Sequence, residues 1–275
     1  MDQRARRTGP TARVRVTESG AERTSEREDR LITEEPLEVR LEWPGAPARR
    51  VWVTMRTPGH DFELAAGWAA HEGLVPAAGG ITGVAYCTDA ALSPEQDFNV
   101  VTVTLAAAPD HVPHQHDALS AGSSACGECG TDSIDAALTR RVPGWTGELP
   151  SPDLVRRLPA VLREGQRLFD RTGGVHAAAL VTAAGELLVV REDVGRHNAV
   201  DKVTGARLLA GHSPAGACLV VSGRVGYELV QKALAVGTGS LVAVGAPTSL
   251  AVSLAGRGGL ALYGFTAADR TVRYA

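Results

Sequence analysis

Hydrophobic residues in the first half of the chain come in short runs that are typical of β-strands. Val101, Val103 and Leu105 alternate with two threonines, which is the period of a strand with one exposed face. Between two such runs, Asp61 can cap a helix whose apolar positions continue to about His71. The strands predicted for this half cover residues 38–43, 51–55, 81–88 and 98–105.

The second half alternates strand patterns with helical patterns. A helix starts at Ser151-Pro152 and runs toward Phe169, and Pro159 is expected to kink or split it. Such alternation predicts an α/β fold with a largely parallel sheet. The remaining predicted elements are a hairpin over 176–182 and 186–191, strands over 218–221, 240–244 and 259–263, and helices over 197–209, 227–236 and 248–254.

These patterns divide the chain into four segments. Residues 1–30 are polar and poor in large apolar side chains, which predicts a disordered N-terminal segment. Residues 31–118 are predicted to form an N-terminal α+β domain, and residues 132–275 a C-terminal α/β domain. Residues 119–131 form a loop between them that carries two cysteines, and a long loop without periodicity inside a compact chain is more often functional than accidental.

The composition limits the classes of function. A chain of 275 residues with 44% hydrophobic residues can build a substantial core, and a formal net charge of −3 favours neither a nucleic-acid binder nor a membrane-surface protein. No stretch reaches about 18 uninterrupted apolar residues, and no apolar signal segment follows Arg6-Arg7. Four cysteines are too few for a disulfide scaffold. We therefore expect a soluble, cytoplasmic protein without a nucleic-acid or membrane partner.

Two of the cysteines, Cys126 and Cys129, are bracketed by glycines in the run Cys-Gly-Glu-Cys-Gly. Glycines allow sharp turns and leave the sulfur atoms sterically open. A helix that starts near Thr131 would favour a thiolate at its N-terminus, and a thiolate is the form that attacks a persulfide. The other two cysteines, Cys87 and Cys218, fall in predicted strands and are expected to be buried small apolar residues.

Three other interpretations of the cysteine pair remain open. A structural zinc site needs about four ligands, which His111, His114 and His116 could help to supply. A thioredoxin-like redox motif normally follows a strand and opens a helix, whereas this pair follows a long loop. The last alternative is an ordinary turn with incidental cysteines.

Several strand ends carry residues that suit an anionic ligand, because helix N-termini at the carboxyl edge of an α/β sheet present free N–H groups. Ser222 and Arg224 follow one strand, and Thr248 follows another. The loop 191–198 adds acids, arginines and His197, which could also form a local ion pair with Asp201. Each junction alone fits ordinary capping, but together they favour a nucleotide-sized anion. There is no Gly-x-Gly-x-x-Gly motif and no P-loop.

The order of these segments resembles the formate dehydrogenase accessory sulfurtransferase family (FdhD). The resemblance extends from about residue 34 to the end of the chain and is most specific around Gly195. The matching pieces are residues 57–73, the loop from Cys126 to Cys129, and residues 169–178, 191–202, 222–228 and 246–249.

The resemblance implies a sulfurtransferase that accepts sulfur from a cysteine desulfurase. It implies that the sulfur is passed to a molybdenum or tungsten bis-molybdopterin guanine dinucleotide, which is bound before its insertion into formate dehydrogenase. Cys126 would carry the persulfide, with Cys129 as its partner, and no resident metal is expected. The family's C-terminal domain is similar to the cytidine deaminase fold, giving an α/β/α domain beside a smaller α+β domain, and its members pair as homodimers.

The resemblance also implies a cofactor-binding stretch near the C-terminus, in addition to Ser222, Arg224 and Thr248. The family usually has more arginine in this stretch, and Ala267 stands where a basic residue is expected, although Arg270 and Arg273 are present. The residues of the stretch are Phe265, Thr266, Ala267, Ala268, Asp269 and Arg270.

Two rival functions belong to other classes. A cofactor-binding chaperone without sulfur transfer would use the same strand ends and would not need Cys126. A zinc-dependent hydrolase of the deaminase type needs a His-x-Glu and a Pro-Cys-x-x-Cys motif. Here Ala125 precedes Cys126, and no His-x-Glu occurs in the chain.

Overall fold

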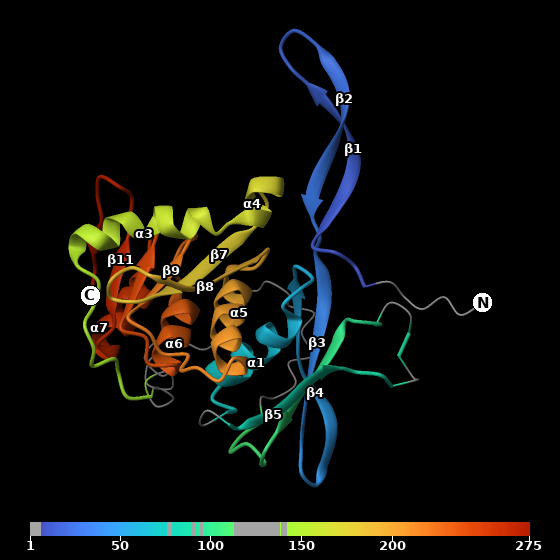
Figure 1. The fold of residues 1–275 in the computed structure, drawn as a ribbon, viewed down its shortest axis with the longest axis vertical. Coiled ribbons are helices and arrows are strands. Elements are labelled where there is room, and N and C mark those ends of the chain that lie inside the picture. Colours follow the sequence, from blue (N-terminus) through green and yellow to red (C-terminus); the bar gives the residue numbers. More distant parts are fainter. Residues whose placement is uncertain (1–6, 76–78, 90–91, 94–95, 113–137, 139–141) are drawn as a thin grey trace.

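The computed structural model describes residues 7–75, 79–89, 92–93, 96–112, 138 and 142–275. Two sheets form the body of the molecule, and a two-stranded hairpin extends away from it (Figure 1). The first sheet has the order β4-β3-β6-β5, and the second has the order β12-β11-β10-β9-β7-β8.

The first sheet belongs to the N-terminal half and is covered by one helix. Its strands are β3 (Glu35–Trp43), β4 (Ala46–Arg56), β5 (Ile81–Tyr86) and β6 (Val100–Leu105), and the helix is α1 (Asp61–His71). Val39, Val101 and Leu64 are fully buried between them, and the rings of Trp52 and Trp68 stack at 4.9 Å. The pattern of apolar positions therefore predicted these strands and this helix to within a few residues.

The second sheet is mixed, so the prediction of a largely parallel sheet was wrong. Strands β9, β10 and β11 are parallel to one another, but β7 is antiparallel to both of its neighbours, β8 and β9, and β12 is antiparallel to β11. The reason is the tight turn at Gly185, which joins β7 and β8 as a hairpin, whereas only helical crossovers return a chain in the same direction. The strands are β7 (His176–Val181), β8 (Leu187–Asp193), β9 (Cys218–Val221), β10 (Ser240–Ala243), β11 (Ala261–Gly264) and β12 (Val272–Arg273).

Helices cover both faces of the second sheet (Figure 1). On one face lies α3 (Pro152–Glu164), which buries Val155, Leu158 and Leu162. The helix continues through Pro159, so the split predicted at that residue was wrong; it ends at Glu164, and the separate short α4 (Arg167–Thr172) follows. The other face carries α5 (Arg196–Leu209), α6 (Tyr227–Ala235) and α7 (Ser249–Gly258).

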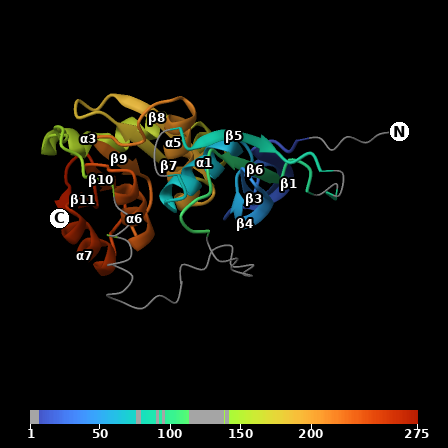
Figure 2. The same ribbon diagram turned by 90° about the horizontal axis from the view of Figure 1, so that it is seen from below.

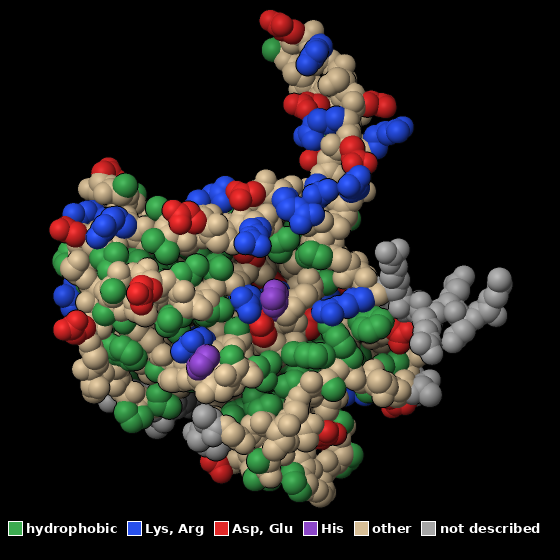
Figure 3. Space-filling model, viewed as in Figure 1, with side chains coloured by type: hydrophobic (Ala, Val, Ile, Leu, Met, Phe, Trp, Pro, Cys, Tyr) green, Lys and Arg blue, Asp and Glu red, His purple; other side chains and the backbone are tan. Residues whose placement is uncertain are grey.

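The prediction that residues 1–30 are disordered was wrong from Thr11 onward. Residues Thr11–Ser19 (β1) and Thr24–Ile32 (β2) pair as an antiparallel hairpin in continuous register. Its side chains are mostly exposed and include ion pairs from Arg27 to Glu18 and from Arg13 to Glu28 (Figure 3). Backbone pairing and cross-strand ion pairs hold this hairpin together, and its strands contribute little to a hydrophobic core. Its low apolar content therefore led to the prediction of disorder.

The two halves meet where α1 crosses α5, and Figures 1 and 2 both show these helices side by side between the two sheets. The crossing depends on two glycines. A Cβ atom at Gly67 would lie 1.8 Å from the carbonyl oxygen of Asp201, and one at Gly205 would lie 1.8 Å from that of Glu63. Only glycine permits backbones to approach so closely.

Candidate functional site

The two cysteines of the predicted sulfur-transfer loop, Cys126 and Cys129, lie outside the described residues, as do His114 and His116. Among the described cysteines, Cys218 is fully buried in β9, and burial raises the pKa of its thiol to about 12. Cys218 is therefore the inert packing residue that the sequence predicts.

Cys87 differs from the expectation of a buried strand residue. It follows β5 directly and is half-buried, and the guanidinium of Arg40 donates to its Sγ atom over 3.7 Å. Cys87 lies at the edge of the first sheet because it follows β5, the outermost strand of that sheet.

The loops that leave β9, β10 and β11 are bonded to one another along the carboxyl edge of the second sheet. The amide of Gly245 donates to the carbonyl of Gly223 at 3.2 Å, and the amide of Phe265 donates to the carbonyl of Gly245 at 3.1 Å. A Cβ atom at Gly245 would lie 2.8 Å from the Gly223 carbonyl, so the loops touch backbone to backbone. Helices α6 and α7 start from this edge, and α5 starts from the same edge after β8.

The residues predicted from strand ends all lie on this edge, although two of them have clear structural roles. Ser222 accepts a hydrogen bond on its Oγ atom from the amide of Ala177 at 2.9 Å, which ties β9 to β7. Thr248 caps α7, because its hydroxyl accepts from the amide of Ala251 at 3.3 Å. Arg224 is exposed and has no ion-pair partner among the residues that the structure describes.

The predicted stretch from Phe265 to Arg270 forms a mostly exposed turn next to the loop that follows β10, where a Cβ atom at Gly264 would lie 2.7 Å from Cδ of Pro247. Phe265 has a positive φ of 49°, is 43% exposed, and has the guanidinium of Arg270 5.5 Å from its ring centroid. Thr266 is buried and its hydroxyl bonds to that of Thr271 at 2.9 Å. Ala267, Ala268, Asp269 and Arg270 are exposed, and Ala267 and Arg270 exchange backbone hydrogen bonds.

The third predicted junction, residues 191–198, connects the two halves of the molecule. Asp193 is fully buried; its Oδ2 atom contacts Nζ of Lys202 at 2.6 Å and accepts from the amide of Thr57 at 3.1 Å. Lys202 also donates to the carbonyl of Thr57 at 2.9 Å, and Asn198 donates to the carbonyl of Met55 at 2.8 Å. Most of this loop therefore serves the fold.

The ion pair between His197 and Asp201, which the spacing allowed as an alternative, does not form. Asp201 instead accepts from Nδ1 of His71 and from Nζ of Lys232, each at 2.6 Å. His197 contacts Glu228 at 2.9 Å. Residues four positions apart on a helix are neighbours, but Asp201 points into the α1–α5 crossing while His197 points to the carboxyl edge.

One residue at the carboxyl edge, His176, was not singled out from the sequence, and Arg196 appeared there only as one of the arginines of the loop 191–198. His176 begins β7 and Arg196 begins α5, and a Cβ atom at Gly223 would lie 3.2 Å from Nδ1 of His176 and 3.8 Å from Cδ of Arg196. Burial lowers the pKa of His176, and the positive charges of Arg196, His197 and Arg224 lower it further. The signals were the run Gly173-Gly174-Val175-His176 and the position of Arg196 directly after Gly195, both within the matching segments.

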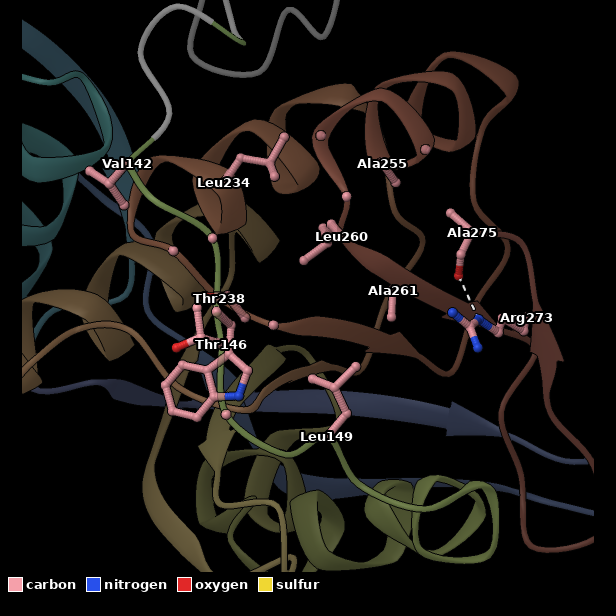
Figure 4. A pocket seen from close by; sticks show the side chains of 18 residues that line it. Val142, Thr146, Leu149, Leu234, Thr238, Ala255, Leu260, Ala261, Arg273 and Ala275 are labelled. Carbon is pink, nitrogen blue, oxygen red and sulfur yellow. Dashed lines mark hydrogen bonds between the residues drawn. The ribbon is translucent and has the colours of Figure 1, made fainter.

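A cavity of about 360 Å³ lies at the opposite, amino-terminal edge of β10 and β11 (Figure 4). Leu234, Leu260 and Thr238 line it, together with residues of the segment 142–149. Seven of the lining residues are glycines. Arg273 brings a guanidinium to it but donates to the carbonyl of Ala275 at 2.8 Å. The described lining includes no acidic residue, histidine or cysteine, so the carboxyl edge is the stronger candidate site.

Metal-binding clusters and membrane-spanning helices are both absent from the described residues. No group of three His, Cys, Asp or Glu side chains within them is arranged to hold a metal ion. No helix in the described part of the chain combines the length and the apolar character needed to cross a membrane.

Comparison with known proteins gives a consistent picture. The model of the FdhD/NarQ family matches residues 32–275. The sulfur carrier protein FdhD of Streptomyces avermitilis is 46% identical over 250 residues, which are 88% of this chain and 85% of the relative. The protein of the same name from Mycolicibacterium paratuberculosis is 43% identical over 262 residues, with 94% of both chains covered.

A solved structure is also similar. It is the crystal structure of a protein from Desulfotalea psychrophila that is provisionally described as a formate dehydrogenase accessory protein. The TM-score is 0.73 at 21% sequence identity, with 96% of this chain and 97% of that chain covered. This similarity supports the fold alone.

Proposed function

The chain belongs to the FdhD/NarQ family, and from this premise we propose that it carries sulfur on Cys126 from a cysteine desulfurase to the molybdenum cofactor of formate dehydrogenase. The observation that carries the proposal is the match over most of the chain to relatives named sulfur carrier proteins, 46% and 43% identical. The Cys126–Cys129 pair supplies the sulfur chemistry that such a function requires.

The first step of the proposed transfer balances without an outside oxidant. The thiolate of Cys126 attacks the outer sulfur of the donor's persulfide, a new S–S bond forms on Cys126, and the donor's thiolate leaves as the old S–S bond breaks. Cys129 lies three residues away and is the thiol that we assign to exchange with Cys126 afterwards.

The carboxyl edge of the second sheet is the proposed site for the cargo, a bis-molybdopterin guanine dinucleotide. Three helix N-termini start from this edge, and helix N-termini favour phosphate oxygens. The exposed turn at Phe265 and Arg270 offers an aromatic ring and a guanidinium next to the loop that follows β10, and Arg224 lies on the loop that follows β9. These groups suit a ligand that has both phosphates and a planar base.

The finer features of the proposal follow the family resemblance. We assign the second sheet with its two helical layers to the cytidine deaminase-like class, and α3 on one face with α5, α6 and α7 on the other supports this assignment. We also propose a cytoplasmic homodimer that meets both the desulfurase and formate dehydrogenase. Neither partner's docking surface is assigned.

Mass spectrometry of the full chain after incubation with a desulfurase and cysteine tests the sulfur-carrier function. We expect one added sulfur atom on the peptide that contains Cys126, and removal of this mass by a thiol reductant. The Cys126→Ala variant should gain no sulfur and should not support formate dehydrogenase activity in cells that lack the wild-type chain.

Cys87→Ala is the matched control, because Cys87 is a partly exposed cysteine far from the loop in sequence. It should gain sulfur on the Cys126 peptide as the wild-type chain does. Full formate dehydrogenase activity with Cys126→Ala would refute the carrier function and would favour a chaperone that binds the cofactor without transferring sulfur.

A further inference from the structure

The β1–β2 hairpin stands apart from the two sheets, and Figure 1 shows both of its strands projecting beyond the body of the molecule. Its base meets the body at Ile32, where a Cβ atom at Gly174 would lie 3.2 Å from Cγ2 of Ile32. The family model matches from residue 32 onward, so the hairpin precedes the matched region. A two-stranded hairpin alone is marginally stable in water, and pairing with a further strand would stabilise it.

The outer edge of β2 is open for such a strand. β2 pairs with β1 along its whole length, from Thr24 opposite Ser19 to Ile32 opposite Thr11. Within the part of the chain that the structure describes, no backbone hydrogen bond reaches the other edge of β2. An edge strand with open N–H and C=O groups is a template on which another strand can pair.

The charges of the hairpin favour one kind of partner. Residues 11–32 contain five arginines and five acidic residues, so the hairpin has no net charge. A segment without net charge has no long-range attraction to nucleic acid or to an anionic membrane. Both signs instead occur within one short run of β2, residues 26–30, with the sequence Glu-Arg-Glu-Asp-Arg. Such a run can be complementary to a second copy of itself.

An antiparallel alignment of two β2 strands centred on Glu28 sets opposite charges face to face. Arg27 then lies opposite Asp29 of the partner subunit, and Glu26 lies opposite Arg30 of the partner subunit. Each of these pairs occurs twice, because the alignment has two-fold symmetry. Opposite charges across antiparallel strands stabilise the pairing, whereas like charges destabilise it. An alignment centred on Arg27 would set Glu26 opposite Glu28, so the charges also select the register.

The central residue, Glu28, would lie opposite its own counterpart. Its negative charge is already offset within the hairpin, because Arg13 contacts its carboxylate at 3.2 Å. The side chains of Glu28 and Arg13 are 64% and 66% exposed, so both have room to rearrange when a second strand arrives. A single like-charge contact, balanced by two arginines, is therefore compatible with the alignment.

We propose that β2 pairs edge to edge with β2 of a second copy of this chain. The product is a four-stranded sheet in the order β1-β2-β2-β1, with the two-fold axis at Glu28. The inference rests on the proposed function for the expectation of a homodimer, and it assigns the surface through which the two copies meet. It also gives the projecting hairpin the additional strands that a two-stranded element lacks.

Charge exchange on β2 of the full chain tests the pairing, with sedimentation equilibrium as the measurement. Arg30→Glu sets two acids opposite each other at two places, and Glu26→Arg does the same with two arginines. Each single variant should raise the Kd of the dimer by about tenfold. The double variant Glu26→Arg/Arg30→Glu restores opposite charges at both places, so its Kd should return close to the wild-type value.

Arg23→Glu is the matched control, because Arg23 lies in the turn of the hairpin and outside the alignment. It should dimerise as the wild-type chain does. Oxidative cross-linking gives a second measurement that does not depend on affinity. Glu28→Cys should form a disulfide with the same position of the partner subunit, identified by mass spectrometry, whereas Ser25→Cys should not, because its two copies lie far apart in this register.

The outcomes separate the interface from the proposed function. Equal Kd values for the wild-type chain and both single variants, with no link in Glu28→Cys, would overturn the interface and leave a homodimer that forms through another surface. A wild-type chain that stays monomeric would overturn both the interface and the proposed homodimer. Neither result bears on the sulfur added to the Cys126 peptide, which tests the carrier function separately.

Discussion

The crossing of α1 and α5 and the carboxyl edge of the second sheet both concentrate charged side chains, but they use them differently. At the crossing, Asp193 is paired with Lys202 and Asp201 with Lys232, each at 2.6 Å, and both carboxylates are buried. At the edge, no described residue forms a direct ion pair with Arg196 or Arg224, although the pKa of Glu228 is lowered by its hydrogen bond to His197 and further by the charge of Arg196. Charge that is paired inside the protein holds the two halves together, whereas charge that is left unpaired at a strand end is available for a ligand.

The crossing also sets the protonation of its own groups. Burial lowers the pKa of His71, and the ring is oriented by Asp201 on one side and by Thr204 on the other. Burial alone would raise the pKa of Glu63, but hydrogen bonds from Arg191 and His60 outweigh it and lower that pKa to about 2. The same interface therefore favours the neutral form of His71 and the ionised form of Glu63.

The largest expected effect comes from breaking the buried pair. Lys202→Met leaves the carboxylate of Asp193 buried with only neutral donors, and we expect it to lower the free energy of unfolding by about 3–5 kcal/mol. Urea unfolding followed by circular dichroism measures the loss. Adding Asp193→Asn to the same chain should restore part of the stability, and a loss below about 1 kcal/mol for Lys202→Met alone would contradict the view that this pair joins the two halves.

The next effect tests the closeness of the two helices. In Gly205→Ala the new methyl group would overlap the backbone of Glu63, so the helices must separate at a cost of about 3 kcal/mol. Gly256→Ala in α7 is the control, because no atom lies within 4 Å of the point that its Cβ atom would occupy, and alanine should stabilise that helix by up to about 1 kcal/mol. Equal thermal midpoints for the two variants would show that the crossing tolerates a side chain.

The pH dependence of stability distinguishes the buried histidine. Because the pKa of His71 is lower in the folded chain, the unfolded chain binds a proton first, and stability falls as the pH drops below about 6.5. Urea titrations from pH 7.5 to 5.5 should show this fall, and His71→Gln should make the slope smaller. His176 has a lowered pKa as well, so His176→Gln is the necessary comparison.

The smallest effect is expected at the carboxyl edge. Arg196→Met removes a guanidinium whose buried Nε atom has no described partner, so the free energy of unfolding should stay within about 0.5 kcal/mol or rise by up to about 1 kcal/mol. Thermal unfolding measures it. A loss of more than about 2 kcal/mol would mean that Arg196 stabilises the fold as Lys202 does, and the contrast between the two regions would fail.

Much of the fold could be predicted because its elements have clear periods. The strands of the first sheet and most helices of the second half carry apolar residues at the spacing of strands and helices. The hairpin at Gly185 was predicted, but alternation alone does not show that β7, and not β8, lies beside β9, which makes β7 antiparallel to both of its neighbours. The β1–β2 hairpin escaped prediction because its strands do not enter a core.

The sequence predicted where the candidate site lies in the fold, but it did not predict which side chains contact one another there. Ser222, Arg224, Thr248 and the turn at Phe265 lie on one edge because the carboxyl ends of parallel strands meet there. The partner of Asp201 is His71, which lies 130 residues earlier, and no local spacing indicates such a pair. The proximity of His176 to Arg196 likewise depends on β7 and β8 pairing at His176 and Asp193.

The glycine-lined crossing has a consequence for anyone who would divide this protein. A fragment that carried only the second sheet would lose Thr57, whose amide and carbonyl bind Asp193 and Lys202, and would expose the groove in α5 at Gly205. Such a piece should be produced together with its N-terminal complement, and the two would be expected to reassemble rather than to remain stable as separate products.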